Sequence, residues 1–304
     1  MTHVKIYLLL SILFLVTSCS KEKIEDKIEP KNWFEISDLG FEEFLVNKGF
    51  DTDLQVNGRM LISDAKDIKE IQIIELTETS NFIHNLKGIE QFVSLEFLEV
   101  AGHKIDSISL TKNLYLTKLD IRVNNLKFLD ISQNLNLTAL ECAANNLTEI
   151  DLSKNSKLET LSISNNQLKK LDLKKNPHLK KVDCHQNNIQ ELSFEQNGRL
   201  EDLDLGGNSL FSLTISSLDK LQKLDFSHNP LQTIQIENCP SLEYVYCTFN
   251  PNLKNFYFLN SRKLGVFYST LNYSLEEICL ADTVLFWQTD ELELDEHTAV
   301  KVCE

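Results

Sequence analysis

The feature that most constrains this chain is a 21-residue repeat that runs from Leu95 to Asn250. An apolar residue returns at this interval, and a second apolar residue or Cys follows it two positions later. Five positions after it stands Asn, except in the first repeat, which has His103. A period of this length is typical of a solenoid, in which each coil buries its apolar residues only by stacking on its neighbours. The repeating apolar positions are Leu98, Leu119, Leu140, Leu161, Val182, Leu203, Leu224 and Val245.

Each repeat also contains a second apolar half-unit, such as Leu129-Asp-Ile131 or Ile150-Asp-Leu152. The alternation of apolar and other residues predicts short strands on both flanks of every coil. This half-unit has an Asn of its own, which gives way to Leu218 and Cys239 in later repeats. A buried Asn amide both donates and accepts, so it can satisfy backbone groups inside the turns. The Asn residues of the second half-unit are Asn113, Asn134, Asn155, Asn176 and Asn197.

The pattern L-x-x-L-x-L-x-x-N-x-L resembles that of the leucine-rich-repeat proteins. The resemblance implies a right-handed solenoid, conventionally classed as α/β but here mostly β, with about nine 21-residue coils. Because the terminal coils must cover their exposed apolar ends, we expect a helical N-terminal cap and a short C-terminal cap.

The first 18 residues combine one Lys with an apolar run, Ile6 to Val16, that is too short to span a bilayer as a stable helix. The sequence Val16-Thr17-Ser18-Cys19 resembles the lipobox of bacterial lipoproteins. This resemblance implies cleavage before Cys19 and lipid attachment to Cys19; an ordinary secretory signal is the alternative. Residues 19–31 are highly charged and predict a tether that cannot bury a core.

Residues 32–94 are predicted to form a cap helix followed by atypical repeats. Phe41, Phe44 and Leu45 stand at helical spacing, Asp38 or Ser37 can cap the helix, and Gly49 follows its last turn. The segments 41–45 (Phe-Glu-x-x-Leu), 49–51 (Gly-Phe-Asp) and 88–92 (Gly-Ile-Glu-x-Phe), together with the repeats, resemble the leucine-rich-repeat surface proteins of Bacteroidota, distant relatives of internalins. The resemblance covers about residues 33–303 and implies an exported, cell-surface protein of the outer membrane. Many such proteins end in a secretion-sorting domain, whereas this sequence carries a lipobox.

After Asn250 the apolar register slips by one residue, and the solenoid is expected to span residues 95–280, followed by a cap at 281–304. Related proteins carry an Ile-Cys and a terminal Cys near this end, which implies a pair between Cys279 and Cys303. Export to an oxidising compartment permits such a disulfide.

The other cysteines of the repeats are predicted to be buried thiols outside any disulfide. Cys142, Cys184 and Cys247 occupy one inward column, two and three coils apart. Strands of successive coils lie ~4.8 Å apart, so even the nearer pair is too distant to bond. Cys239 replaces an Asn inside the coil, and no C-x-x-C pair suggests a metal.

Composition excludes some partners. The formal net charge is −15, which disfavours nucleic acid and anionic lipid because both require basic patches. The sequence lacks a Gly-rich phosphate loop, G-x-S-x-G and H-E-x-x-H, and its seven His show no evident ligand spacing with a carboxylate. We therefore expect no enzyme activity, no cofactor and no metal centre.

The remaining candidate site is the concave face, where strand residues beside each inward position point to solvent. We call the outward residues at the centre of each strand the central column. It is acidic over most of its length and becomes aromatic towards the C-terminus. It reads Glu99, Asp120, Glu141, Ser162, Asp183, Asp204, Asp225, Tyr246 and Tyr268.

These features predict a monomeric protein that binds a protein or glycan through the concave face, with membrane contact only through the lipid anchor. Exposed aromatic clusters are typical of binding hot spots. The alternatives are an envelope-structural or accessory glycan-binding lipoprotein, an acidic column that only maintains solubility, and rings covered by residues 281–303, including Phe286 and Trp287. Cation binding by the acidic column, or by Asp51 and Asp53, also remains open. The predicted contact residues are Tyr244, Tyr246, Phe249, Tyr268, Asp183, Asp204 and Asp225.

Overall fold

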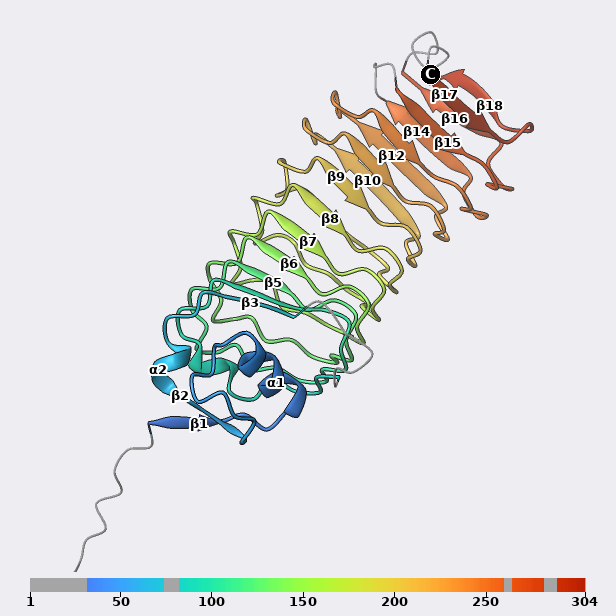
Figure 1. Ribbon diagram of the computed structural model, residues 1–304. Helices are drawn as coiled ribbons and strands as arrows, with labels where there is room; N and C mark the ends of the chain where they lie inside the picture. The colour runs from blue at the N-terminus through green and yellow to red at the C-terminus, as the bar shows by residue number, and fades with distance from the viewer. Residues whose placement is uncertain (1–31, 74–81, 260–263, 282–288, 304) are drawn as a thin grey trace, which may run out of the picture. The chain divides into compact units, whose positions relative to one another are not determined.

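The structure, a computed structural model, describes residues 32–73, 82–259, 264–281 and 289–303. All of them belong to one compact unit, Asn32–Glu304 (Figure 1). The predicted signal peptide, Cys19 and the tether lie outside the described residues. Within the described ranges, no helix is both long and apolar enough to cross a membrane.

The unit is built on one long parallel sheet to which almost every coil contributes one strand (Figure 1). Neighbouring strands keep the repeat register, so that Leu140 pairs with Leu119 on one side and with Leu161 on the other. The strands, from the N-terminal to the C-terminal edge, are β3 (Glu70–Ile73), β4 (Phe97–Val100), β5 (Lys118–Asp120), β6 (Ala139–Glu141), β7 (Thr160–Ser162), β8 (Lys181–Asp183), β9 (Asp202–Asp204), β11 (Lys223–Asp225), β13 (Tyr244–Tyr246), β15 (Val266–Ser269) and β17 (Glu291–Leu294).

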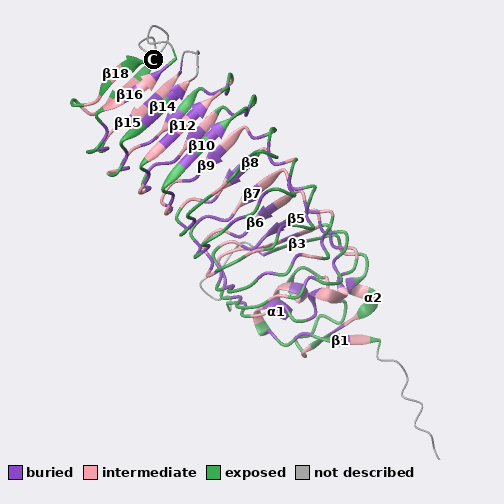
Figure 2. Ribbon diagram, turned by 180° about the vertical axis from the view of Figure 1, so that it is seen from behind, coloured by how far each residue is buried: buried purple, intermediate pink, exposed green. Residues whose placement is uncertain are grey.

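The predicted inward columns form the core. All eight repeating apolar residues from Leu98 to Val245 are buried, as are the residues two positions after each of them. Figure 2 shows this burial as buried segments that recur from coil to coil. The prediction of a mostly β leucine-rich-repeat solenoid of about nine coils is therefore confirmed.

The prediction of strands on both sides of every coil is wrong for the earlier repeats. The side opposite the long sheet, formed by the second half-units, is called the second flank. A five-stranded parallel sheet is present there, but it begins only in the later repeats. From Leu129 to Phe194 the corresponding half-units form no strand. The strands of this sheet are β10 (Ser212–Ser216), β12 (Thr233–Glu237), β14 (Asn255–Leu259), β16 (Glu277–Leu280) and β18 (Ala299–Val302).

In three of these four half-units, the physical reason is the Asp that stands between the two inward residues. Asp130, Asp151 and Asp172 each accept a hydrogen bond from the backbone N–H two residues later, at 2.8–3.0 Å. This local Asx turn bends the chain and competes with strand pairing. In β10 and β12 the same position holds Thr214 or Gln235, which form no such turn in the described structure, and the half-units pair as strands.

The N-terminal end is covered by the predicted cap helix. Helix α1 (Leu39–Asn47) buries Phe41 and Leu45, and the side chain of Asp38 caps it by accepting the Phe41 N–H at 3.1 Å. The same carboxylate accepts the backbone N–H of His84 at 2.8 Å, which ties the helix to the first repeats. The other cap elements are β1 (Trp33–Glu35) paired with β2 (Arg59–Leu61), α2 (Ile62–Ala65) and the 3-10 helix η1 (Ile89–Gln91).

Two columns of Asn stabilise the coils differently. The first follows the strands of the long sheet and includes Asn166, and the second follows the second half-units and includes Asn155. In the first column Asn166 donates to the carbonyls of Cys142, Ile163 and Ser164, and its Oδ1 accepts the Leu147 N–H at 2.9 Å. The second-column residue Asn155 donates to only two carbonyls, and its buried Oδ1 has no hydrogen-bond partner among the described residues. Both columns thus bond successive coils together, but only the first uses its amide fully.

At the C-terminus the solenoid continues beyond the predicted end at Leu280. Strands β17 and β18 pair in parallel with β15 and β16, so residues 291–302 add to both sheets instead of forming a separate cap. Their apolar residues Leu292, Leu294 and Val300 pack on the core, which explains why the coil pattern persists. A disulfide joins Cys279 to Cys303, the pair that the family resemblance implies, with Cα atoms 5.1 Å apart.

The four cysteines inside the repeats are buried and form no disulfide, as predicted. Burial raises the pKa of the Cys247 thiol to about 12 and also raises the pKa values of Cys142 and Cys184. A thiol that resists ionisation is a poor nucleophile and metal ligand. These cysteines therefore act as small apolar core residues.

Candidate functional site

The outward side of the long sheet, which we call the strand face, carries the predicted central column. Strand pairing places successive members of this column side by side, as Asp183 lies beside Asp204 and Tyr246 beside Tyr268. Asp120 is buried and the other members are partly exposed. The sheet thus assembles one row of mostly acidic side chains, interrupted at Ser162, that ends in aromatic rings.

An arginine balances charge at the N-terminal end of this row. Arg122 donates to Asp120 at 2.7 Å and its guanidinium lies 3.2 Å from Glu141. Arg122 stands two residues after Asp120, just beyond the strand, and Glu141 belongs to the next coil. One cation therefore bridges the carboxylates of two coils.

The corresponding place three coils further on holds a histidine. His185 stands two residues after Asp183, and its Nδ1 lies 2.6 Å from Asp183 Oδ1 and 3.9 Å from Asp204 Oδ2. One ligand atom from each of these three residues lies within 4.8 Å of the others. The prediction that no histidine stands at ligand spacing with a carboxylate is therefore wrong. The D-x-H sequence, read together with the 21-residue period, could have revealed this cluster.

Asp204 is the most crowded carboxylate of the cluster. Burial raises its pKa above the ordinary value, and the nearby carboxylates of Asp225 and Asp183 raise it further. The N–H of Gly206 donates to Asp204 Oδ1 at 3.0 Å and opposes this shift. Asp225, the next member of the column, accepts the Ser227 N–H at 2.9 Å. Negative charge thus concentrates in the middle of the strand face.

The aromatic end of the strand face brings together only some of the predicted rings. Tyr246 and Tyr268 meet edge to face with ring centroids 5.6 Å apart. Tyr244 is 36% exposed on the same strand as Tyr246. Phe249 is 41% exposed but lies on the turn after β13, where its ring packs on His228 with a centroid separation of 4.9 Å. The three tyrosines therefore form the aromatic site, and Phe249 belongs to its margin.

Two contacts fix the rings of this site. The Tyr268 hydroxyl donates to Glu291 at 2.6 Å, a bond that raises the pKa of Tyr268 to about 12. The Lys223 ammonium lies 6.0 Å from the centroid of the Tyr246 ring, within the range of a cation–π contact. Strand β17, which contains Glu291, lies beside β15 in the same sheet. Phe286 and Trp287, predicted as an alternative cover for the rings, lie outside the described residues.

The acidic pair in the N-terminal cap does not form a comparable cluster. Asp51 is buried, and burial together with Asp53 raises its pKa. The carboxylate of Asp53 accepts from Gln55 and Asn57, while Thr52 donates to Asp64. Among the described residues, only the cluster of Asp183, His185 and Asp204 has the geometry of a possible metal site.

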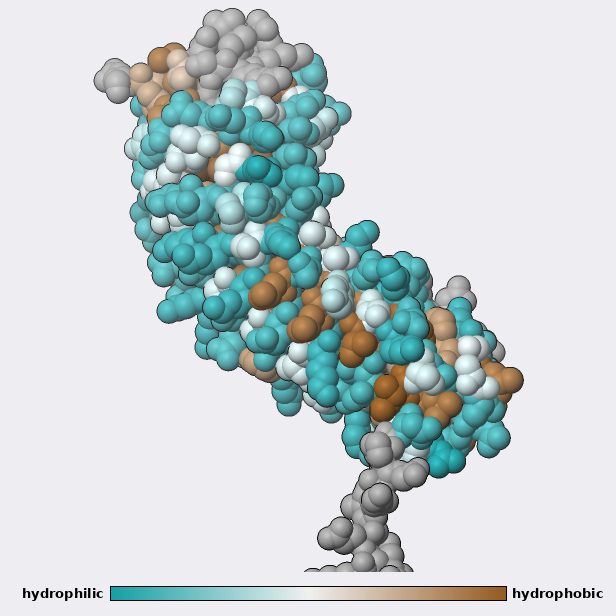
Figure 3. Space-filling view, turned by 90° about the vertical axis from the view of Figure 1, so that its left-hand side faces the viewer, coloured by the Kyte–Doolittle hydropathy of each residue, from teal (hydrophilic) through white to brown (hydrophobic). Residues whose placement is uncertain are grey.

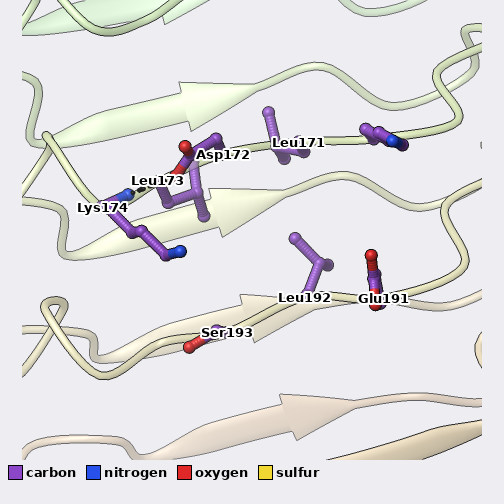
Figure 4. Close-up of a pocket in the computed structure, with 8 residues that line it drawn as sticks. Leu171, Asp172, Leu173, Lys174, Glu191, Leu192 and Ser193 are labelled. Carbon is purple, nitrogen blue, oxygen red and sulfur yellow. Dashed lines mark hydrogen bonds between the residues drawn. The ribbon is translucent and has the colours of Figure 1, made fainter.

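Two other surfaces are weaker candidates for a functional site. A shallow cleft of about 360 Å³ opens between two neighbouring half-units of the second flank, with Leu171 and Leu192 in its lining (Figure 4). The face shown in Figure 3 is largely hydrophilic, with hydrophobic side chains gathered mainly over the N-terminal half. Leu114 and Leu135, which occupy one position in adjacent coils, are among the exposed apolar residues. Neither surface contains an aromatic cluster like that of the strand face among the residues named here.

Comparisons with known proteins agree with this architecture. The family described as Leucine Rich repeats (2 copies) matches residues 156–195 and 219–261. No curated protein sequence matches the chain significantly. The chain thus carries leucine-rich repeats, and the match covers the central and late coils.

Solved structures show similar solenoids at low sequence identity. The internalin InlF of Listeria monocytogenes is 18% identical, with a TM-score of 0.57 over 87% of this chain and 90% of that chain. A leucine-rich-repeat protein of Leptospira interrogans is 17% identical, with a TM-score of 0.45 over 70% and 77%. The functional domain of InlJ from Listeria monocytogenes, described as including a cysteine ladder, is 18% identical, with a TM-score of 0.38 over 80% and 73%. The similarity to InlF shows a shared fold.

Proposed function

We propose that this chain is a non-enzymatic binding protein that holds a protein partner against its strand face. The observation that carries the proposal is the continuity of this face, where a row of carboxylates leads into a cluster of tyrosines. A solenoid presents such a row on a rigid, extended support, which suits interaction with another macromolecule. Leucine-rich repeats are typical of protein–protein interaction domains.

The tyrosine cluster supports the position of the contact. Large rings with a polar edge are enriched among residues that dominate binding energy. Because Glu291 and Lys223 already hold Tyr268 and Tyr246, these side chains lose little conformational freedom when a partner binds. Tyr244 adds an exposed ring on the same strand.

The acidic row supports the chemistry of the partner. Complementary charge steers association and selects partners, so carboxylates at Asp183, Asp204 and Asp225 favour a basic protein surface. The net charge of −15 favours the same class of partner. We therefore propose a partner that places basic residues along the carboxylates and an apolar group on the rings.

The proposal includes the location of the protein. The sequence from the apolar run to Cys19 supports lipid attachment at Cys19, and the resemblance to surface proteins of Bacteroidota supports the outer membrane. Several acyl chains on one residue give stable anchorage, since one chain binds membranes only reversibly. Replacement of Cys19 by Ala should abolish incorporation of a palmitate analogue, and continued labelling would refute the anchor.

The function is tested with the compact unit, residues 32–304, immobilised and exposed to host and bacterial protein extracts and to a polysaccharide array. Once a retained protein is identified, Tyr246→Ala should weaken its affinity about tenfold or more, because hot-spot rings contribute ~2 kcal/mol. The matched control is Tyr257→Ala, because Tyr257 is 40% exposed on the opposite sheet.

Both variants should keep a melting temperature close to that of the wild type. A large loss of stability in Tyr246→Ala with unchanged partner affinity would mean that the ring is structural and would refute the proposed site. Retention of polysaccharides alone would support the alternative of an accessory glycan-binding lipoprotein.

A further inference from the structure

We propose that Asp183, His185 and Asp204 form a binding site for a divalent metal ion of the zinc type. The ion is held by one imidazole nitrogen and two carboxylate oxygens on the strand face. The site shares Asp183 and Asp204 with the proposed partner contact, but zinc binding can be tested without a partner.

The repeat geometry builds this donor set. Asp183 and His185 are two residues apart on one chain segment, so both side chains project from the same side of the coil. Parallel pairing of β8 with β9 puts Asp204 directly beside Asp183. The three potential ligand atoms already lie within 4.8 Å of one another. Zinc bonds of about 2.0–2.2 Å to nitrogen and oxygen then require only small side-chain rotations.

Comparison with the cluster around Arg122 shows what is distinctive about the cluster of Asp183, His185 and Asp204. Asp120, Arg122 and Glu141 occupy the same repeat positions as Asp183, His185 and Asp204. The guanidinium of Arg122 is permanently charged and contacts both of its carboxylates. An imidazole in its place can be neutral, and a neutral imidazole is a common metal ligand. The same repeat position thus holds a permanently charged side chain at Arg122 and a side chain able to bind a metal at His185.

A glycine adjoins the outer side of the cluster. Gly206 is the counterpart of His185 in the next coil. A Cβ atom on Gly206 would lie only 3.2 Å from Asp204 Oδ1 and 3.7 Å from Asp225 Oδ1. The backbone N–H of Gly206 holds Asp204 Oδ1 at 3.0 Å, while Oδ2 lies 3.9 Å from His185 Nδ1, on the side of the proposed ion.

The donor types select the class of metal. Imidazole nitrogen suits zinc and its first-row neighbours, whereas magnesium and calcium prefer oxygen ligands alone. A zinc ion would take His185 Nδ1 in place of the present contact with Asp183. The side chain of Asn165, whose Nδ2 is 3.1 Å from His185 Nε2, could then rotate its amide to accept a hydrogen bond from Nε2–H. Three protein ligands would leave a fourth position for water.

The test is calorimetric titration of residues 32–304 with zinc chloride, together with visible absorption of the cobalt(II) form. We expect one zinc per chain and a cobalt spectrum with the intense bands of tetrahedral coordination. His185→Arg should abolish binding, because it restores the arrangement at Arg122 and supplies a fixed positive charge. Asp204→Asn, which preserves shape, should weaken affinity by at least about tenfold, and Asn165→Ala by about tenfold.

Two control variants separate this site from general attraction to acidic or histidine side chains. Asp225→Asn removes the neighbouring charge of the column, and His228→Gln removes an exposed histidine one coil beyond Asp204. Both should retain the zinc stoichiometry and the cobalt spectrum. The proposal is overturned if wild-type protein binds no zinc, or if a correctly folded His185→Arg or Asp204→Asn variant binds it as tightly as the wild type.

Discussion

The coils before Leu210 and those after it share one strand face but differ on the opposite flank. In the earlier coils, the half-units from Leu129 to Phe194 form turns stabilised by Asp and Asn side chains. In the later coils, five strands pair into a second sheet. The same apolar spacing therefore supports two flank structures.

The difference teaches that an Asp between two inward positions favours a turn over a strand in three of the earlier half-units. The half-unit Leu192-Ser193-Phe194 forms no strand either, although it has no Asp. Asp in that place supplies its own hydrogen bond to the chain, whereas Thr214 or Gln235 leaves the backbone groups to a neighbouring strand. The core changes at the same boundary. The later coils fill the space between the two sheets with the rings of Phe226, Phe256, Phe258 and Phe267.

The largest effect is expected from removing a ring in the later core. Phe256 is buried and its ring centroid lies 5.8–6.2 Å from those of three other phenylalanines. Phe256→Ala should lower the free energy of unfolding by about 4 kcal/mol, because it leaves a large cavity. Leu129→Ala, at the corresponding place in an earlier coil, should cost about 2–3 kcal/mol.

Urea denaturation followed by circular dichroism measures both losses. Phe256→Leu, which keeps most of the apolar volume, should recover more than half of the stability lost in Phe256→Ala. Equal losses for Phe256→Ala and Leu129→Ala would show that the two halves do not differ in core packing.

Substitutions in the two Asn columns should lower the free energy of unfolding by less than Phe256→Ala does, and by different amounts in the two columns. Asn166→Ala should cost about 3 kcal/mol, because four backbone groups lose a partner inside the coil. Asn155→Ala should cost about 2 kcal/mol, since only two carbonyls lose their donor. Asn155→Leu, which copies Leu218 of the later coils, should cost about 1 kcal/mol because it also removes the unpartnered Oδ1.

Thermal and urea unfolding of these three variants test the order of the losses. The opposite order for Asn166→Ala and Asn155→Ala would contradict the difference seen in their hydrogen bonds. If Asn155→Leu proved as damaging as Asn166→Ala, an apolar residue could not replace the second-column Asn in the earlier coils as Leu218 does in the later ones.

Much of the fold could be predicted because the repeat imposes it at every coil. The spacing of Leu98, Leu119 and Leu140 fixes which residues point inward, and the structure buries all three. The second flank could not be predicted from spacing alone. Its apolar alternation is the same whether Asp151 makes a turn or Gln235 lies in a strand, so the alternation does not distinguish the two structures. The last coil was missed because the interval from Phe267 to Leu292 is longer than the repeat.

The candidate site, like the fold, could be predicted only in part. Strand parity correctly predicts that Tyr244, Tyr246 and Tyr268 share one face, because each neighbours an inward residue. Parity does not extend to Phe249, which lies on a turn and packs on His228. The cluster of Asp183, His185 and Asp204 depends on side-chain directions just beyond the strand ends. There the period indicates which residues are neighbours but gives no distances between their atoms.

The smallest predicted effect is a shifted pKa in one of the turns that replace strands in the earlier coils. The backbone N–H of Ser153 donates to Asp151 Oδ1 at 2.8 Å, and this bond holds the pKa of Asp151 below its ordinary value of 3.8. A depressed pKa means that the turn is stabilised above the ordinary pKa and that this stabilisation is lost as pH falls through the folded-state pKa. The Ser153 amide resonance should therefore shift in an NMR titration with a midpoint below pH 3.8. Asp151→Asn keeps the acceptor oxygen without the charge, so it should retain the turn and lose this transition. A midpoint at or above 3.8, or the same transition in Asp151→Asn, would show that the carboxylate does not fix the turn and would remove the proposed cause of the missing strands.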